Sequence, residues 1–434
     1  MKIGLHLLTM MLVVAGGCAS VAYGQARGGG MPGGLPSSIT VPRDIPTHGP
    51  PDWIDNASSR ASAGLERADA AQDLRLSKTQ LDRAASIARA APADYELDRN
   101  GALAIRGEVL VSGLDDAGLA KIQRAGFAIV RRSEIPDLGI TLAVVVHDGL
   151  SASRAADRLR RIDPDGSYDL NHVYFESGSR PEQGSVAAVP LRARPGGSTV
   201  VGMIDASVAP VIDSAARVRI VRRTFGTGQG VASHGTAVAA LLAREPGPVT
   251  IYAADIFGAG PRGGTAELLT RALGWMASER VPVINISMVG PSNGLVATVT
   301  RTMIARGFTI VAPVGNDGPA GRLMYPASYP GVIAVSAADA SGRLLPEASR
   351  VKRIDFVGPG IATVPDPSGR ATLVRGTSFA APIVSRQLAD QVRLPDPSAA
   401  RRAIVHLERT AVPPPGRGYG RGLIGVATTA GRGK

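Results

Sequence analysis

Two continuous apolar runs mark the C-terminal half of the chain. Residues 200–204 (VVGMI) and 308–312 (FTIVA) have the length and composition of strands that are buried on both faces of a parallel sheet. Residues 233–242, which are rich in alanine, predict a helix between these runs. Buried strands separated by a helix predict an α/β domain built on a parallel sheet.

A second pattern of apolar and polar positions occupies residues 101–176. It predicts strands at 108–111, 127–131, 140–146 and 168–175, with helices at 115–125 and 153–162. On the first helix, apolar residues recur at helical spacing at Leu119, Ile122 and Ala125. The order βαββαβ predicts a small ferredoxin-like module, a fold that by itself indicates no function.

The residues before this module differ in composition. Residues 1–24 are typical of a signal peptide, because Lys2 precedes a short apolar core and small residues surround a cleavage point after Gly24. That core is too short for a transmembrane helix. Residues 25–60 are rich in Gly and Pro and predict a flexible segment, whereas residues 61–100 predict a helical spacer of unassigned role.

The one cysteine of the chain, Cys18, lies inside the predicted signal peptide. With the small residues before it, Cys18 loosely resembles a bacterial lipoprotein signal, so a lipid anchor at Cys18 is an alternative to release from the cell. Cleavage after Gly24 would remove Cys18 and leave a mature chain without disulfides.

Residues 375–382 (RGTSFAAP) place Ser378 among small residues where a loop meets a predicted helix. The N-terminus of a helix offers unpaired N–H groups and a positive dipole end to an oxyanion formed there. Such a serine is suited to act as a nucleophile. The same residues are also typical of an ordinary helix cap, so the interpretation depends on a base elsewhere in the chain.

Three other segments supply partners for Ser378. Asp205 ends the first apolar run, His234 lies in the first turn of the predicted helix at 233–242, and Asn316 lies in a Gly-Asn-Asp-Gly turn after the second run. Because the carboxyl ends of parallel strands share one edge of a sheet, these side chains are expected to share a crevice. A buried aspartate, a capping histidine and a plain turn are the structural alternatives for each one alone.

In the order Asp, His, Asn, Ser, these motifs resemble the subtilase (subtilisin-like, S8) family of serine peptidases. The resemblance covers residues 198–427, and a tail of residues 428–434 follows. It implies a subtilisin-like parallel sheet flanked by helices. It also implies a triad in which Ser378 is the nucleophile, His234 the base and Asp205 the orienting acid, with Asn316 in the oxyanion hole.

Residues 283–290 (VINISMVG) are similar to the substrate-binding strand of that family. The resemblance therefore implies a peptide groove lined by Ser287, Met288, Val289, Gly290 and Gly315. Val289 stands where the family normally has glycine, which predicts a narrower groove. The chain also departs from the family at Ala206-Ser207 and at Ala237 and Ala240, none of which is a triad member.

Upstream of this region, the module at 101–176 resembles the inhibitory propeptide of the family. The linker at 177–197, rich in Gly, Ser, Pro and Arg, is where we expect the processing cut. The predicted protein is a secreted or periplasmic, self-processed endopeptidase that binds protein or peptide substrates and its own propeptide. A catalytically silent binding or scaffold protein with the same fold is the alternative, against which the four intact active-site residues argue.

Charge and histidine spacing narrow the chemistry further. The net charge is +12, but the arginines are dispersed in pairs without a basic aromatic patch, so we expect no nucleic-acid partner. The six histidines show no metal-binding spacing, so we expect neither a catalytic metal nor another cofactor. Structural calcium is common among subtilases, but no acidic loop here identifies a site for it.

Overall fold

The computed structural model describes residues 76–177, 198–227, 233–258, 263–319, 321, 324–351, 353–413, 416 and 418–425. The predicted signal peptide, the Gly/Pro-rich segment, the first part of the predicted spacer, nearly all of the linker at 177–197 and the C-terminal tail lie outside the described residues.

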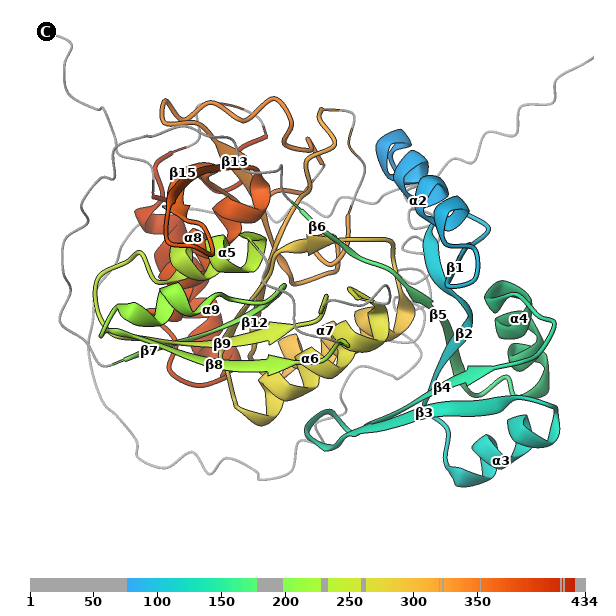
Figure 1. The fold of residues 1–434 in the computed structure, drawn as a ribbon. Helices are drawn as coiled ribbons and strands as arrows, with labels where there is room; N and C mark the ends of the chain where they lie inside the picture. Colours follow the sequence, from blue (N-terminus) through green and yellow to red (C-terminus); the bar gives the residue numbers. More distant parts are fainter. Residues whose placement is uncertain are drawn as a thin grey trace, which may run out of the picture. The chain divides into compact units, whose positions relative to one another are not determined.

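The C-terminal α/β domain contains a parallel sheet of seven strands in the order β14-β13-β12-β10-β7-β9-β8 (Figure 1). The strands are β7 (Thr199–Asp205), β8 (Val218–Thr224), β9 (Val249–Asp255), β10 (Val283–Ile286), β12 (Thr309–Pro313), β13 (Ile333–Ala338) and β14 (Phe356–Pro359). The two apolar runs fall in β7 and β12, so the predicted parallel sheet is confirmed.

Helices cover both faces of this sheet. One face carries α5 (Ser233–Leu242), α8 (Thr377–Ala389) and α9 (Pro397–Thr410), and the other carries α6 (Ala266–Ser278) and α7 (Gly294–Ala305). Successive residues of β7 point to opposite faces of the sheet and pack in different apolar clusters. Met203 packs with α5 and α8, whereas Ile204 packs with α6 and α7. Burial on both faces explains why the strands are continuous apolar runs.

Shorter elements complete the α/β domain. They are β11 (Met288–Val289), which follows β10, the antiparallel pair β15 (Ile361–Pro365) and β16 (Ala371–Arg375), which leads into α8, and the 3₁₀ turn η2 (Pro210–Ser214). Side-chain caps begin two of the large helices, because Thr265 accepts from Leu268 N before α6 and Asn293 accepts from Val296 N before α7.

Residues 76–177 form the N-terminal module, drawn in blue to green in Figure 1. Its elements are α2 (Lys78–Ala90), β1 (Tyr95–Leu97), β2 (Leu103–Ser112), α3 (Asp116–Arg124), β3 (Ala128–Ile135), η1 (Pro136–Leu138), β4 (Ile140–Val146), α4 (Ala152–Ile162), β5 (Ser167–His172) and β6 (Phe175–Glu176). From β2 to β5 the order is βαββαβ, and antiparallel strands pair in the order β5-β2-β4-β3, which confirms the predicted ferredoxin-like arrangement. Apolar residues of α3 and α4 cover one face of this sheet.

The elements at both ends of the module differ from the predicted ones. Strand β1 pairs with β2, so part of the predicted spacer belongs to the module sheet. The strand predicted at 168–175 divides, because β5 ends at His172 and β6 pairs with β11 of the α/β domain. We call residues 173–177 the tail strand.

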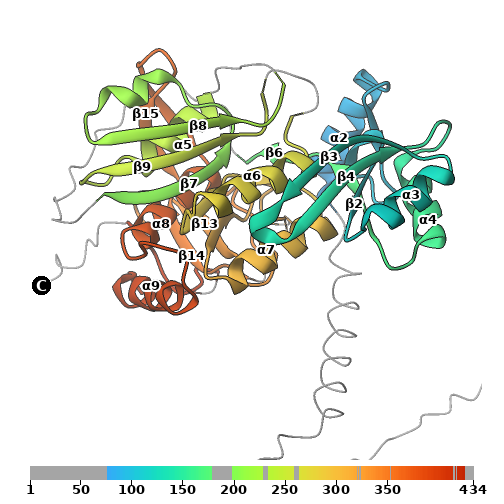
Figure 2. The ribbon, with the colours of Figure 1, turned by 90° about the horizontal axis from the view of Figure 1, so that it is seen from below.

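The other face of the module sheet packs against α6 and α7. Figure 2 shows the hairpin of β3 and β4 beside these helices, and η1 contacts both of them. Ile135 and Leu138, at the end of that hairpin, are buried in the same apolar cluster as Leu273 of α6. Gly274 makes room for Ile135, since a Cβ atom at Gly274 would lie 2.5 Å from Ile135 Cγ2.

Candidate active site

Asp205, His234 and Ser378 meet at the carboxyl edge of the parallel sheet. His234 Nδ1 lies 2.8 Å from Asp205 Oδ1, and His234 Nε2 lies 3.0 Å from Ser378 Oγ. Asp205 and Ser378 have no exposed surface, and the His234 side chain is 8% exposed. In this geometry the carboxylate orients the imidazole, and the imidazole can accept the proton of the serine hydroxyl.

A close approach of α5 to β7 sets the distance between Asp205 and His234. Asp205 ends β7, and its Oδ1 also accepts a hydrogen bond of 2.7 Å from Ala206 N. Gly235 follows His234 and faces the chain after β7, where a Cβ atom at Gly235 would lie only 2.2 Å from Ala206 O. Only glycine permits this approach, so Gly235 is part of the structure that places the base.

The backbone around Ser378 is held by two bonds from outside α8. Pro382 lies within α8 and has no N–H for Ser378 O, its partner four residues earlier. The Ser287 hydroxyl donates to Ser378 O instead, at 3.1 Å. Thr377 N donates to Asn316 Oδ1 at 2.9 Å, which ties the start of the helix to the predicted oxyanion residue.

A buried polar chain supports Ser287 from behind. Asn285 Nδ2 donates to Ser287 Oγ at 2.7 Å, and the Ser385 hydroxyl donates to Asn285 Oδ1 at 3.1 Å. The sequence analysis did not assign a role to Asn285 or Ser385. The sequence did contain a signal for these contacts. Asn285 is a single amide side chain within the apolar strand at 283–286, and a buried polar side chain requires hydrogen-bond partners.

Electrostatic interactions favour the protonated form of His234. Burial alone would lower the pKa of His234, but the charge and hydrogen bond of Asp205, together with the charge of Glu176, raise it above the ordinary value. Burial in turn raises the pKa of Glu176, against the effect of the His234 charge. The base is therefore coupled to a carboxyl group of the tail strand.

The tail strand lies in an extended groove of the α/β domain. It pairs antiparallel with β11, with Glu176 opposite Met288 and Phe175 opposite Val289. On its other side, Tyr174 N donates to Gly264 O at 2.6 Å. An extended segment of this chain thus pairs with Met288 and Val289, two of the predicted groove residues.

The last described residue of the tail strand reaches the triad. Ser177 N donates to Ser287 O at 3.4 Å, and Asn316 Nδ2 donates to Ser177 Oγ at 3.3 Å. The Ser177 hydroxyl also lies 3.5 Å from Thr377 Oγ1, one residue before Ser378. The tail strand therefore ends beside the Asn316 amide and beside Thr377, the residue before Ser378.

The remaining predicted groove residues occupy different positions. Gly290 packs against the ring of Tyr174 and exchanges two backbone hydrogen bonds with Tyr325, of 2.9 and 3.1 Å. Gly315 adopts a positive φ of 97° just before Asn316, and its carbonyl accepts from Ser349 N rather than from the tail strand. Gly315 thus shapes the turn that carries Asn316.

Among the described residues, one group has the side chains and spacing to hold a metal ion. It consists of Glu176, Asp205 and His234, whose ligand atoms lie within 4.8 Å of one another. Two of these are the acid and base of the triad and the third belongs to the tail strand, so we assign the group to the active site. In the same part of the chain, no helix combines the length and apolar character needed to span a membrane.

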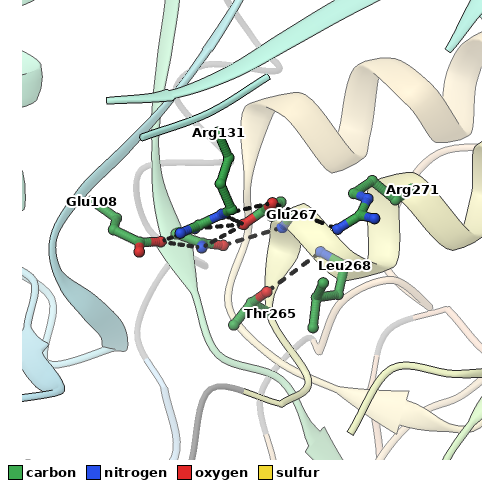
Figure 3. A network of polar contacts seen from close by, with 7 residues as sticks. Glu108, Arg131, Thr265, Glu267, Leu268 and Arg271 are labelled. Carbon is green, nitrogen blue, oxygen red and sulfur yellow. Dashed lines mark hydrogen bonds and ion pairs between the residues drawn. The ribbon is translucent and has the colours of Figure 1, made fainter. Parts of the chain in front are cut away.

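A buried ion network joins the module to the α/β domain (Figure 3). Arg131 of β3 donates to Glu108 of β2 at 2.6 Å and to Glu267 of α6 at 2.7 Å. Asn171 of β5 donates to Glu108 at 2.8 Å and accepts from Glu267 N at 3.1 Å. Although its burial opposes the effect, the two carboxylates raise the pKa of Arg131, which binds both of them, and Arg271 lies 3.8 Å from Glu267 as a more distant cation.

Comparison with known proteins agrees with this geometry. A model described as "Subtilase family" matches residues 204–420, half of the chain. Subtilisin DY of Bacillus licheniformis is 29% identical over 256 residues, which are 54% of this chain and 92% of that protein. Subtilisin amylosacchariticus of Bacillus subtilis subsp. amylosacchariticus is 29% identical over 171 residues, 36% of this chain and 45% of that protein. The chain thus spans less than half the length of some curated relatives that it matches.

Solved structures extend the fold comparison to the module. Fervidolysin from Fervidobacterium pennivorans, a keratinolytic enzyme related to subtilisin, has a TM-score of 0.60 at 19% identity, covering 76% of this chain and 62% of fervidolysin. The epidermin leader peptide processing serine protease of Staphylococcus aureus has a TM-score of 0.57 at 16% identity, covering 74% of this chain and 97% of that chain. At these identities the likeness concerns the fold alone. The family match over half of the chain, together with the fold and the geometry at Asp205, His234 and Ser378, shows that this chain belongs to the subtilase family.

Proposed function

We propose that this protein is a serine endopeptidase that hydrolyses peptide bonds through Asp205, His234 and Ser378. The observation that carries the proposal is the continuous line of contacts from Ser378 Oγ through His234 to Asp205, at 3.0 and 2.8 Å. A serine hydroxyl becomes a nucleophile when a neighbouring base accepts its proton, and this arrangement supplies that base and its orienting acid.

The steps of acyl transfer follow from the same contacts. His234 accepts the Ser378 proton as Oγ attacks the peptide carbonyl, and it then donates that proton to the leaving amine. The Asn316 amide and the Ser378 N–H donate to the oxyanion of the tetrahedral intermediate. In subtilisin, loss of the equivalent amide lowers kcat by about 100- to 1,000-fold, and a similar effect is expected for Asn316→Ala.

The N-terminal module is proposed to be an inhibitory propeptide that the enzyme cuts from itself between Ser177 and Gly178. Two observations support this bond. The tail strand pairs with β11 as a substrate strand would, and Ser177 is the residue that donates to Ser287 O and contacts Asn316. The following bond opens the predicted linker at 177–197, whose sequence is rich in small residues.

The predicted signal peptide at 1–24 supports export, so the mature enzyme is proposed to act outside the cytoplasm on protein or peptide substrates. Lipid attachment at Cys18 would retain the enzyme at the envelope without changing its chemistry. Mass analysis of the protein purified from its host distinguishes the two locations, because an acylated Cys18 would be present only in the anchored form.

Labelling with a fluorophosphonate and hydrolysis of the peptide VYFESGSR, the sequence of residues 173–180, test the proposed activity. The wild-type chain is expected to react and to cleave the peptide between Ser and Gly, whereas Ser378→Ala does neither. Ser341→Ala serves as the matched control, since the Ser341 hydroxyl is bound to Asp339 in an exposed turn away from the triad. A correctly folded wild-type protein that is neither labelled nor active would be a catalytically silent subtilase and would refute the proposal.

A further inference from the structure

One basic side chain lies in the interior of the α/β domain. Arg386 of α8 is 0% exposed, and among the lysines and arginines that the structure describes it is the only one that is buried. A guanidinium group stays charged in a protein, and burial of its charge is costly unless hydrogen-bond acceptors surround it. The groups that accept its hydrogen bonds therefore define the role of Arg386.

Two of these acceptors belong to the end of α5. Arg386 Nη1 donates to Leu242 O at 2.9 Å, and Nη2 donates to Pro246 O in the segment that follows, at 3.2 Å. Leu242 is the last residue of α5, and Pro246, four residues further on, has no N–H to donate to its carbonyl. A cation at the C-terminus of a helix also interacts favourably with the helix dipole. Arg386 thus caps α5 from α8.

A third acceptor links the same side chain to β7. Arg386 Nε donates to Asp390 Oδ1 at 3.0 Å, and the Thr199 hydroxyl donates to the same oxygen at 2.5 Å. Thr199 is the first residue of β7, and its N–H donates to Pro248 O in the segment after α5 at 2.9 Å. We call Arg386, Asp390, Thr199 and the Leu242 carbonyl the Arg386 network.

The Arg386 network joins the three elements that carry the triad. In β7, α5 and α8 alike, the triad residue lies at or next to one end of the element, and the residue of the network lies at or near the opposite end. The pairs are Asp205 and Thr199 in β7, His234 and Leu242 in α5, and Ser378 and Arg386 in α8. The triad therefore connects one end of these three elements, and the Arg386 network connects the other.

Both helices of this unit are rich in small side chains. Ala237 and Ala239 of α5 and Ala380 and Ala381 of α8 are all buried, and the two helices contact each other within one apolar cluster. Small side chains permit a close approach but interlock less than large ones, so they restrict the tilt of a helix less. Directional hydrogen bonds at the end of α5 restrict that tilt.

The distance between the Arg386 network and the triad makes such a tilt important. His234 and Leu242 are eight residues apart, as are Ser378 and Arg386, so in each helix the network lies about 12 Å along the axis from the triad residue. A tilt of about 3° at the network would move the other end of the helix by about 0.6 Å. Misplacement of a catalytic group by about 1 Å can lower the rate about 100-fold, so about 10-fold is expected for this smaller movement.

We propose that Arg386 is a positioning residue for the triad, which holds α5 and β7 against α8 so that His234 stays within reach of Asp205 and Ser378. This inference rests on the proposed endopeptidase function. Among the described hydrogen bonds and ion pairs, Arg386 contacts neither the tail strand nor a triad residue. Its removal should therefore lower kcat and leave KM nearly unchanged.

Arg386→Met tests this inference in the full chain, because methionine keeps an unbranched side chain in the interior but removes the donors of all three bonds. The cut after Ser177 is a suitable readout, since the tail strand is covalently attached and substrate affinity does not enter the rate. We expect a cut about 10-fold slower than in the wild type. The rate is measured per folded molecule, with the folded fraction taken from circular dichroism at the same temperature.

Met303→Ala is the matched control for lost stability. Met303 is fully buried in α7, on the face of the sheet opposite to α5 and α8, and its truncation leaves a cavity there. Unfolding in urea should show that both variants are less stable than the wild type, but only Arg386→Met should slow the cut per folded molecule. Equal slowing in Met303→Ala would show that reduced stability is sufficient, and would overturn the inference.

Thr199→Val tests whether the Arg386 network acts as one unit. Valine has nearly the shape of threonine but lacks the hydroxyl group, so only the bond from β7 to Asp390 is lost. The cut should slow about 3-fold. Adding Thr199→Val to Arg386→Met should not slow it further, because Asp390 has then already lost the guanidinium that orients it. Slowing that multiplies in the double variant would show that the two side chains act independently, and would contradict the proposed network.

Peptide hydrolysis by the self-processed enzyme separates failure of this inference from failure of the proposed function. With the peptide VYFESGSR, Arg386→Met should have a kcat about 10-fold lower at a nearly unchanged KM. An unchanged kcat in a folded Arg386→Met enzyme, or a loss confined to KM, would overturn this inference alone. A wild-type chain that is neither cut nor labelled by a fluorophosphonate would instead overturn the proposed function.

Discussion

Substitution of Arg131 by methionine should strongly weaken the attachment of the module to the α/β domain. Methionine keeps an unbranched side chain on β3 but removes the one cation between Glu108 and Glu267. The two carboxylate side chains are each only 4% exposed, so Arg131→Met leaves two nearly buried anions without their shared partner. Removing one partner of a nearly buried ion pair is among the costliest changes in a folded protein.

The size of the effect can be bounded from the exposure of the three side chains. Removing one partner of a buried ion pair costs about 3–5 kcal/mol. The Arg131 side chain is itself 37% exposed, and water screens part of the interaction, so we place the loss at about 3 kcal/mol, the lower end of that range. This loss corresponds to about a 100-fold weaker hold of the module.

The free energy of unfolding in urea measures this loss in the full chain that carries Ser378→Ala, in which no cut should occur. Arg132→Met is the matched control on the same strand, because Arg132 pairs with the exposed Asp116 and should contribute less than about 1 kcal/mol. Adding Glu267→Gln to Arg131→Met should recover part of the loss by removing one of the two carboxylates that Arg131 binds.

Equal destabilisation by Arg131→Met and Arg132→Met would refute this reasoning. It would mean that the network in Figure 3 is screened as fully as a surface ion pair. A failure of Glu267→Gln to recover stability would contradict the claim that burial of these two carboxylates without Arg131 causes the loss.

Three further predictions concern the site itself. Glu176→Gln removes one of the charges that raise the pKa of His234. Because only the neutral imidazole can act as the base, the acidic side of the pH profile of self-cleavage should shift to lower pH. A pH profile that does not shift would contradict this coupling. Gly235→Ala places a methyl group against the chain after β7 and should move His234, so the rate of fluorophosphonate labelling should fall about 100-fold while the chain stays folded by circular dichroism. Asn285→Ala removes the hydrogen bonds that join Asn285 to the buried Ser287 and Ser385 hydroxyls, which keep only their bonds to Ser378 O and Ala381 O, and should destabilise the chain by about 1–3 kcal/mol in urea, whereas no loss would show that water replaces the amide.

Much of the fold was predictable because its signals are local. Continuous apolar runs indicate strands that are covered on both faces, and the runs before Asp205 and Asn316 became β7 and β12. The order of elements from β2 to β5 followed from alternating patterns and helical spacing in the same way. The family motifs then identified the residues that meet at the edge of the sheet, which a single motif could not do.

Other features depend on contacts between distant segments and could not be predicted from local patterns. The end of β5 at His172 and the new pairing of β6 arise because the α/β domain offers a backbone acceptor at Gly264 O and a strand at Met288 and Val289. The role of Ser287 as a donor to Ser378 O depends on a proline four residues further along α8. Arg131 was one of several dispersed arginines in the sequence, and only the fold places it between two buried glutamates.

Intact-mass analysis and N-terminal sequencing of the purified full chain test the central claim most directly, when wild type and Ser378→Ala are incubated in parallel. The account predicts that wild type yields a fragment beginning at Gly178, and that Ser378→Ala keeps the module covalently attached over the same time. A wild-type chain that stays uncut, or a Ser378→Ala chain cut between Ser177 and Gly178 at the wild-type rate, would contradict it.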